Sequence, residues 1–401
     1  MIYLDYAATT PLDARVQAAM EPWLAGDYGN PSSLHAPARR ARAAIDEARE
    51  RVAAAIGARP SEIYFTSGGS EGDNWAIKGT AWASQERGRH VVVSAIEHQA
   101  VLAPARFLAR QGWEVTIAPV DGEGLVDPDR LEKLLRPDTV LVAVMHGNNE
   151  MGAIQPIEEI ARRTARRRIP LLVDAVQTAG LLPLDVNELG CDLLVMSAHK
   201  FYGPKGVGAL YIRRGTPVEP LIHGGGQERG LRAGTEHVAG IVGLARALEL
   251  AREEMDQEVP RLSALRDRLW DGLQAKVPGV RLNGPRIERL PNNVNVTIPG
   301  IDGESLLMNL DLLGVAVSSG SACTSGSLEP SHVLLAMGLA PDEARASLRL
   351  TVGRQTTEEE VDAAVDIVAR AAARLREKAP GFDRTSVASG TPARPTEKGS
   401  G

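Results

Sequence analysis

Two apolar segments of this 401-residue chain end in residues that could hold a cofactor. Leu171–Asp174 ends in an acid, and Asp192–Lys200 contains a second apolar run that leads into Ser-x-His-Lys. Short apolar runs of this kind, bounded by polar residues, predict buried parallel strands. Ligands of open α/β sheets bind beyond the carboxyl ends of the strands. A lysine and an acid that meet there suit pyridoxal phosphate, because the lysine amine can form a Schiff base and the acid can pair with the pyridinium nitrogen.

A glycine-rich segment follows another predicted strand. Ile63–Thr66 leads into Ser-Gly-Gly-Ser-Glu-Gly-Asp-Asn at 67–74, and a helix follows. Glycines such as Gly69 let the backbone approach an anion, and Ser70 adds a hydroxyl at a helix N-terminus, which favours phosphate. Taken alone, an ordinary turn with Ser70 as helix N-cap is the better interpretation. The chain has no G-x-x-x-x-G-K-[ST] motif, so a nucleoside triphosphate is a poor ligand.

Other polar side chains follow predicted strands of the same sheet. His98 lies a few residues after the run at 90–94 and is a candidate for ring stacking or acid–base chemistry, although a lone histidine is usually structural. Gln177 follows Asp174 by three positions, and Asn149 follows the run at 140–144. As isolated residues, Gln177 and Asn149 are better interpreted as turn formers.

The two cysteines differ in their surroundings. Cys323 lies among small residues and glycines at 318–327, where an exposed thiol could ionise and react. From composition alone, a small residue in a flexible segment is the better interpretation. Cys191 opens an apolar run and is expected to be structural. Two cysteines make no disulfide framework and show no metal-type spacing, so we expect no metal site and a reducing, cytoplasmic setting.

The order of apolar runs predicts an α/β fold with parallel βαβ units. The expected strands are 63–66, 90–94, 114–117, 140–144, 171–174, 193–196 and 208–212, and a helix over 39–56 ends at Gly57. A smaller α+β unit should follow, with a helix over 260–276 and strands near 294–296 and 315–317. Its last helix begins after Thr357, which forms a capping box with Glu360, and stops before Pro380.

Length and composition limit the class of protein. A chain of 401 residues is expected to form two domains. The net charge of −6 argues against a nucleic-acid-binding surface, and no apolar stretch is long enough to span a membrane. The start of the chain lacks the basic and apolar regions of a signal peptide. The end, from Pro380, is rich in Gly, Ser, Thr and Pro and predicts a disordered tail.

Taken together, the motifs resemble those of the pyridoxal-phosphate-dependent cysteine desulfurases of the class-V aminotransferase family, close to the type that serves iron–sulfur cluster assembly. The matching segments run in family order from 3 to about 354: 3–10, 30–35, 67–74, 97–98, 148–150, 174–177, 197–200, 223–228, 232–235, 318–325 and 349–354. Ser-x-His-Lys at 197–200 and Ser-Ser-Gly-Ser-Ala-Cys-Thr-Ser at 318–325 are together highly specific. The family usually carries threonine at Ser70, and the hydroxyl is kept.

The resemblance implies the transferase architecture known as fold type I. A large domain over 13–256 would hold a mostly parallel seven-stranded sheet. A small α+β domain over 1–12 and 257–380 would carry the catalytic-cysteine loop, and 381–401 would be a disordered tail. The tail does not look like the segment with which assembly-type members dock a scaffold protein.

The resemblance also implies the roles of single residues. Lys200 would form the Schiff base with pyridoxal 5′-phosphate, Asp174 would contact the pyridinium nitrogen, and His98 would stack on the ring. Gln177 and Asn149 would lie near the ring oxygen or the substrate. Further implied groups are Gly69, Ser70, Ser197 and His199 around the phosphate, Thr235 from the second subunit of a homodimer, Arg349 on the substrate carboxylate, and Cys323 as the sulfur acceptor.

The implied reaction converts L-cysteine to L-alanine and leaves a persulfide on Cys323. An iron–sulfur scaffold protein or another acceptor would then take the sulfur, and any contact of Cys323 with a cluster would be transient. An aminotransferase or a selenocysteine lyase is the nearest alternative, although an aminotransferase has no need for Cys323. A sulfur carrier without catalysis is a third alternative, but a carrier needs no Lys200, Asp174 and His98.

Overall fold

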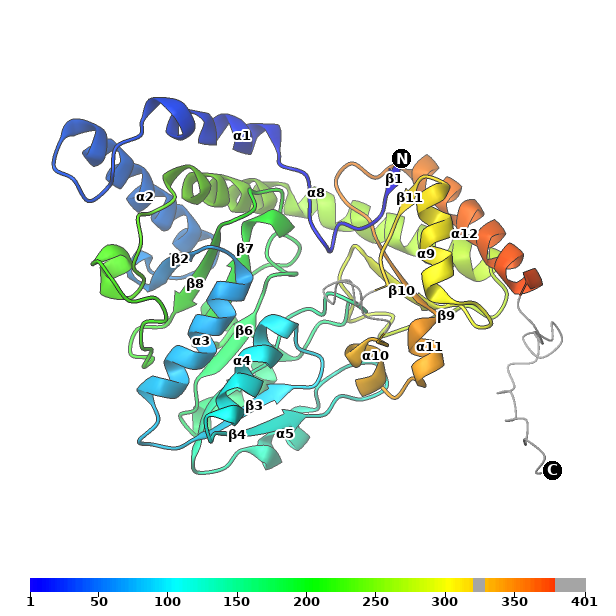
Figure 1. Ribbon diagram of the computed structural model, residues 1–401, viewed down its shortest axis with the longest axis horizontal. Helices are drawn as coiled ribbons and strands as arrows, with labels where there is room; N and C mark the ends of the chain where they lie inside the picture. Colours follow the sequence, from blue (N-terminus) through cyan, green and yellow to red (C-terminus); the bar gives the residue numbers. More distant parts are fainter. Residues whose placement is uncertain (320–328, 379–401) are drawn as a thin grey trace.

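A seven-stranded sheet forms the centre of the molecule, for which a computed structural model describes residues 1–319 and 329–378 (Figure 1). The strand order is β2-β8-β7-β6-β5-β3-β4. The strands are β2 (Ile63–Thr66), β3 (His90–Ser94), β4 (Glu114–Ala118), β5 (Thr139–Ala143), β6 (Leu171–Asp174), β7 (Leu193–Ser197) and β8 (Gly208–Ile212). Strand β8 is antiparallel to both neighbours, and the other pairs are parallel. The carboxyl ends of β3, β5, β6 and β7 therefore meet at one edge.

Helices cover both faces of this sheet, because successive side chains of a strand point to opposite sides. Val91 and Val93 belong to one buried core, with α3 (Gly69–Ala83) and α4 (Gln99–Arg110). Val92 belongs to the other core. That core includes α2 (Ala36–Ala55), α6 (Ile157–Arg166) and the first half of α8 (Val238–Lys276). Shorter elements complete this part: α1 (Ala14–Glu21), α5 (Pro128–Leu134), α7 (Val186–Leu189), η1 (Pro22–Gly26), η2 (Pro60–Glu62), η3 (Ala198–Lys200) and η4 (Gln227–Gly230).

A third core combines the first residues of the chain with parts of its C-terminal third. Leu4 packs there with the second half of α8 and with the helices and strands that follow it. These elements are β1 (Ile2–Tyr3), β9 (Arg281–Leu282), β10 (Asn293–Thr297), α9 (Gly303–Leu312), β11 (Val315–Ala316), β12 (Ser347–Thr351) and α12 (Glu358–Lys378). The short helices α10 (His332–Ala336) and α11 (Pro341–Arg345) pack instead in a core of the central sheet. The order β12-β10-β9 is antiparallel, and β1 pairs with β11. The predicted division into 13–256 and 1–12 with 257–380 stays a prediction.

The local signals read from the sequence are confirmed in most elements. All the predicted strands of the central sheet exist, and Gly57 follows α2 with a left-handed φ of +68°. At the start of α12, the Thr357 N–H donates to Glu360 at 3.1 Å and the Glu360 N–H donates to Thr357 at 3.2 Å. This reciprocal pair is the predicted capping box. The predicted tail over 381–401 lies outside the described residues.

One expectation about the chain path is wrong. The helix predicted to begin at Pro260 is part of α8, which continues through that proline. Proline frees the carbonyl four residues before it, but Asp256 and Pro260 are both exposed, so water can satisfy that carbonyl. The prediction of a mostly parallel seven-stranded sheet is confirmed. Strand β8 is antiparallel, because the connection over 198–207 is too short for a crossover.

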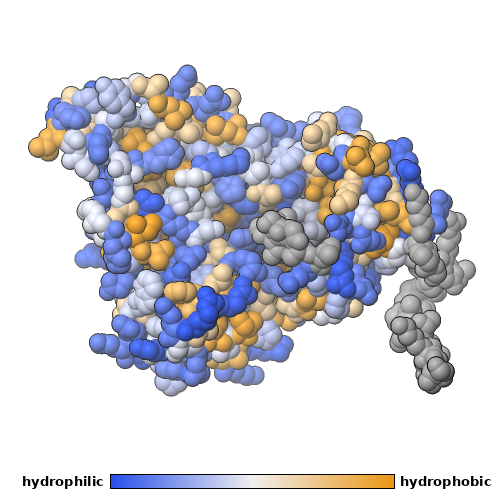
Figure 2. All heavy atoms as spheres, viewed as in Figure 1, coloured by the Kyte–Doolittle hydropathy of each residue, from blue (hydrophilic) through white to orange (hydrophobic). Residues whose placement is uncertain are grey.

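The surface mixes charged and apolar residues. Figure 2 shows a mainly hydrophilic face on which apolar residues lie in separate patches. Within residues 1–319 and 329–378, none of the helices combines the length and the apolar character that a membrane span needs.

Candidate active site

Lys200 lies just beyond the carboxyl end of β7, in the turn η3, where the N-terminal segment covers it. Its Nζ donates to the carbonyl oxygens of Ala7 at 2.5 Å and Ala8 at 2.8 Å. The Nε2 of Gln177 donates to the same Ala7 oxygen at 3.0 Å. The first residues of the chain therefore close over the ends of β6 and β7 and hold the amine there.

Asp174 is the last residue of β6 and is buried beside β7. Its Oδ1 accepts a hydrogen bond from the Val176 N–H at 2.9 Å. Burial raises the pKa of Asp174 above its ordinary value, while the charges of His98 and Lys200 act in the opposite direction. These interactions place the predicted trio of acid, histidine and lysine at one edge of the sheet. An acid in this position gains from a cationic partner such as a protonated ring nitrogen.

His98 is the N-cap of α4. Its Nδ1 accepts a hydrogen bond from the Ala100 N–H at 3.1 Å. An accepting Nδ1 carries no proton, so this contact favours the tautomer with the proton on Nε2. His98 therefore fits both interpretations from the sequence. It caps helix α4 as a structural residue, and its charge acts on Asp174 as expected of a site residue.

The glycine-rich segment brings the N-terminus of α3 against the ends of β6 and β7. A Cβ at Gly69 would lie 2.9 Å from Val176 Cγ2, and one at Gly72 would lie 2.9 Å from Val195 Cγ1. Only glycine permits this close approach. The N-cap of α3 is Gly68, so the interpretation of Ser70 as N-cap is wrong. Ser70 instead lies in the first turn and is exposed.

Two more predicted phosphate ligands are Ser197, which lies next to this helix N-terminus, and His199, which follows it in the chain. Ser197 ends β7 and is buried, and its Oγ lies 3.7 Å from the Cβ position of Gly68. His199 contacts Thr9 Oγ1 through Nδ1 at 3.1 Å. Burial, together with the charges of Lys200 and Lys205, lowers the pKa of His199 to about 4, so its imidazole is neutral at neutral pH.

These residues fit pyridoxal phosphate. A helix N-terminus with two serine hydroxyls and an imidazole provides donors for a phosphate. The N–H groups of the first turn of α3, such as that of Gly69, have no acceptor within the helix and can face a phosphate. Asp174 and Lys200 then match the pyridine nitrogen and the aldehyde of the same cofactor.

Arg349 enters the same region from β12 of the small unit and is buried. Its Nη1 donates to the main-chain oxygen of Asn149 at 2.9 Å, and its Nη2 donates to Asp5 Oδ1 at 2.8 Å. The contact with Asn149 thus uses the main chain and not the amide side chain. Asn148 holds this loop, since its Oδ1 accepts the N–H groups of Glu150 and Met151 at 2.8 and 3.0 Å.

Two further buried acids lie near Asp174. Burial raises the pKa of Glu97 to about 8, although Ser94 and the Met145 N–H donate to its Oε1. Burial, with the charges of Asp174 and Glu97, also raises the pKa of Asp73 well above its usual range. Burial thus favours the neutral form of both acids, whereas the charges of His98 and Lys200 favour the ionised form of Asp174.

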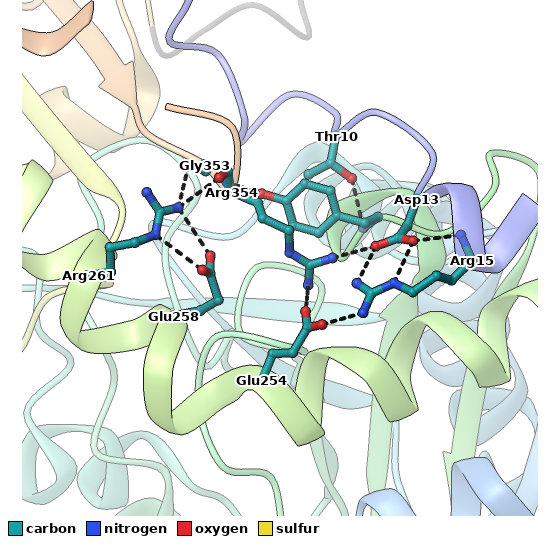
Figure 3. A network of polar contacts seen from close by, with 9 residues as sticks. Thr10, Asp13, Arg15, Glu254, Glu258, Arg261, Gly353 and Arg354 are labelled. Carbon is teal, nitrogen blue, oxygen red and sulfur yellow. Dashed lines mark hydrogen bonds and ion pairs between the residues drawn. The ribbon is translucent and has the colours of Figure 1, made fainter. Parts of the chain in front are cut away.

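A polar network ties the lysine turn to β12 and α8 (Figure 3). Arg354 pairs with Asp13 at 2.7 Å and with Glu254 of α8 at 2.9 Å. Its N–H donates to the hydroxyl of Tyr202 at 2.6 Å, and its guanidinium lies 4.3 Å from the centre of that ring. Arg261 donates to the carbonyl oxygens of Gly353 and Arg354 at 3.1 and 2.9 Å. The strand with Arg349 and the turn with Lys200 are therefore held at a defined separation.

The structure leaves two predicted site residues outside this group. Cys323 lies outside the described residues, but the chain approaches it through Ser318, which forms a main-chain bridge with Arg349. Thr235 is exposed and belongs to a segment that Arg232 fastens to Glu71, at 2.8 Å, in the first turn of α3. Cys191 is buried, and burial raises the pKa of its thiol to about 12, as expected of a structural cysteine.

Sequence reasoning missed the side chain that holds Arg349. Asp5 was part of the motif at 3–10, yet its type and spacing indicated no contact with β12. The carbonyl oxygens of Ala7 and Ala8 were missed for the same reason, since alanines carry no chemical signal. Among the described residues, no group of three or more His, Cys, Asp or Glu side chains could hold a metal ion.

Comparison with known proteins gives consistent matches over nearly the whole chain. The family model for class-V aminotransferases matches residues 2–364. The chain is 54% identical over 379 residues to the protein named cysteine desulfurase IscS of Dictyoglomus turgidum, covering 94% of this chain and 96% of that protein. It is 50% identical over 381 residues to the protein of the same name from Clostridium botulinum (strain Hall), with coverage of 94% and 96%. A solved structure described as a NifS-like protein superposes with a TM-score of 0.88 at 41% identity, covering 93% of this chain and 100% of that one.

Proposed function

The chain belongs to the class-V aminotransferase family, and on that premise we propose that it is a cysteine desulfurase that removes sulfur from L-cysteine and leaves L-alanine. The observation that carries this proposal is that segment 5–8 links Arg349, through Asp5, to Lys200, whose charge acts on Asp174, in a chain about half identical to proteins of that name. An amine, an acid and a guanidinium in one site suit an α-amino acid whose carboxylate is held while its α-proton is removed.

The cofactor of this family is pyridoxal 5′-phosphate, and the residues described above would hold it. Lys200 would bind it covalently, Asp174 would contact its ring nitrogen, and His98 would lie against the ring. Ser70, Ser197, His199 and the N–H of Gly69 would surround the phosphate, and Gln177 and Asn149 would lie near the ring oxygen or the substrate. When bound, the cofactor supplies an electron-accepting ring for charge released at the substrate α-carbon.

Each of the proposed site residues then has a defined role. Arg349 holds the substrate carboxylate and so orients the α-carbon, whose proton the Lys200 amine removes. Asp174 holds a proton at the ring nitrogen, because the ionised acid beside it favours the cationic form. Burial favours the neutral forms of the nearby acids Asp73 and Glu97.

Sulfur transfer falls to Cys323. Its thiolate attacks the substrate Sγ, a sulfur–sulfur bond forms, and the bond between Cβ and Sγ breaks with its electron pair left on the carbon side. A proton delivered to Cβ and the return of the α-proton from the Lys200 amine to Cα complete L-alanine, and the persulfide stays on Cys323. An iron–sulfur scaffold protein or another acceptor then takes the sulfur.

The assembly we propose is a homodimer in the cytoplasm. Thr235 is exposed in the single chain and lies on a segment fastened beside Ser70, so a second subunit could receive its hydroxyl at the phosphate site. Thr235→Ala should then loosen cofactor binding. Full cofactor occupancy in a protein that sediments as a monomer would contradict the shared site.

Assay of the purified protein with L-cysteine tests the function directly. We expect equal amounts of alanine and transferred sulfur, and Lys200→Ala should abolish both. Lys133→Ala, which removes an exposed lysine of α5, is the matched control and should keep the full rate. Asp174→Asn should slow turnover by about 10²-fold or more, the scale of one preorganised electrostatic contact. Normal desulfuration by Lys200→Ala would contradict the proposal.

A further inference from the structure

Tyr202 follows Lys200 by two positions and adopts a backbone conformation that is rare for a residue with a large side chain. Its φ is +65°, in the left-handed region, where a Cβ crowds the main chain. Such a residue persists only where surrounding contacts hold it. Its N–H donates to Thr10 Oγ1 at 2.8 Å, and its carbonyl oxygen accepts from the Asp13 N–H at 3.0 Å. The segment 10–13 therefore fixes the main chain of Tyr202.

The same segment also holds the residue before Lys200. Both the N–H and the Oγ1 of Thr10 donate to the carbonyl oxygen of His199, at 3.0 and 2.9 Å. The turn that carries Lys200 is thus bound on each side of the lysine, at His199 and at Tyr202. A displacement of Tyr202 would therefore displace Lys200 as well.

The side chain of Tyr202 reaches the segment that follows β12. Its hydroxyl accepts the Arg354 N–H at 2.6 Å, and the Arg354 guanidinium lies 4.3 Å from the centre of its ring. Asp13 at 2.7 Å and Glu254 at 2.9 Å hold this guanidinium in place (Figure 3). Arg354 lies just beyond the end of β12. The phenol of Tyr202 therefore links the lysine turn to β12, the strand of the arginine that we assign to the substrate.

We propose that Tyr202 is a positioning residue of the reaction, which acts through Arg354 to fix the distance between Lys200 and Arg349. This rests on the proposed function, in which Arg349 holds the substrate carboxylate and the Lys200 amine removes the α-proton. Both groups belong to one small molecule, so proton transfer requires the amine and the guanidinium at a matched separation. A misplacement of about 1 Å can slow a reaction by about 10²-fold, whereas the carboxylate is still held by Arg349.

Exchange of the α-proton of L-alanine in deuterium oxide isolates this step, because it needs Lys200 and Arg349 but no sulfur transfer. The Lys200 amine removes the α-proton and returns a deuteron from the solvent to the same carbon, with no change of oxidation state. Proton NMR of the cofactor-loaded protein gives the exchange rate at saturating L-alanine, and titration calorimetry gives the dissociation constant. In Tyr202→Phe the ring stays and only the hydroxyl is lost. We expect the saturated rate to fall at least about tenfold and the dissociation constant to stay within about twofold.

Two further variants complete the test. Tyr211→Phe is the matched control, because Tyr211 is buried on β8 opposite Leu194, near the start of β7, and so lies away from the sheet edge with Lys200. It should keep both the exchange rate and the dissociation constant. Asp13→Asn keeps the shape of the side chain that holds Arg354 and removes its charge. It should also slow exchange without weakening the binding of L-alanine, and it decides the matter even if Tyr202→Phe does not fold.

A saturated exchange rate within about twofold of the wild type in both variants would overturn the proposal, even with a lower melting temperature, since Tyr202 would then serve only the fold. Weaker L-alanine binding with an unchanged saturated rate would also overturn it. Failure of the proposed function gives a different result. If the wild type does not exchange the proton, or if Arg349→Gln does not weaken binding, the assignment of Lys200 or Arg349 is wrong. If both assignments hold while Tyr202→Phe exchanges normally, only the role of Tyr202 is wrong.

Discussion

Glu228 is expected to be among the most sensitive positions for stability. Arg49 of α2 donates to both of its carboxylate oxygens, at 2.6 and 2.8 Å, and the two side chains are 5% and 3% exposed. The Phe65 N–H of β2 donates to the same carboxylate at 2.9 Å, and the Arg49 guanidinium lies 4.7 Å from the centre of the Phe65 ring. Glu228→Ala would leave a buried guanidinium without its acid and a strand N–H without its acceptor.

Removing one partner of a buried ion pair costs about 3–5 kcal/mol of the free energy of unfolding. We expect a loss in the upper half of this range, because Glu228→Ala also leaves the Phe65 N–H without a hydrogen-bond acceptor. Glu228→Gln keeps an oxygen acceptor and should lose less. The double variant Arg49→Met with Glu228→Leu removes both charges and should recover part of the loss. Guanidinium chloride unfolding, followed by fluorescence and by circular dichroism, measures each change.

A loss below about 1 kcal/mol in Glu228→Ala would refute the reasoning, because that is the range of exposed pairs. The variant has a second readout. Glu228 and Arg229 both adopt left-handed φ angles, of 45° and 58°, in the segment that leads to Thr235. Once Arg49 releases this segment, cofactor affinity should also fall if Thr235 completes a partner's phosphate site. If Glu228→Ala is destabilised but keeps its cofactor affinity, the stability prediction stands and the role of Thr235 in a partner's phosphate site is contradicted.

Three other predictions address single side chains. Burial raises the pKa of Glu97 to about 8, so the folded chain keeps a proton that the unfolded chain releases. The contribution of this bound proton to stability is complete below the ordinary carboxyl range and is lost as the pH rises through 8. Glu97→Gln should therefore gain melting temperature relative to the wild type between pH 6 and pH 9, and a constant difference would contradict this. The buried thiol of Cys191 has its pKa raised to about 12, so iodoacetamide should modify Cys323 in the native protein and Cys191 only after unfolding, as peptide mass spectrometry can decide. Pro260→Ala should stabilise the exposed middle of α8 by about 1–3 kcal/mol in denaturant unfolding, because it restores a helix hydrogen bond; a less stable variant would show that the proline is needed.

Local features of the fold could be predicted from the sequence because their signals lie within a few residues. The run Leu171–Asp174 is apolar, short and ended by an acid, and it forms a strand with the acid at its end. Gly57 ends a helix because its left-handed φ suits glycine, and Thr357 with Glu360 begins one by exchanging hydrogen bonds over three residues. Strand alternation and right-handed crossovers then place the carboxyl ends of parallel strands together. The approach of Asp174 to Lys200 follows from this topology.

Contacts between distant segments were decided only by the tertiary structure. Nothing in the order of residues indicates that Asp5 would meet Arg349, because a carboxylate near the start of a chain has many possible arginine partners. The pair of Arg49 with Glu228 depends equally on how α2 packs against a loop far along the chain. At Pro260 the local signal was misleading. Proline predicts a helix boundary, but the packing of both halves of α8 keeps the helix continuous. Sequence spacing encodes the short-range geometry of strands, turns and caps, whereas the choice of a charge partner depends on burial, which exists only once the cores have formed.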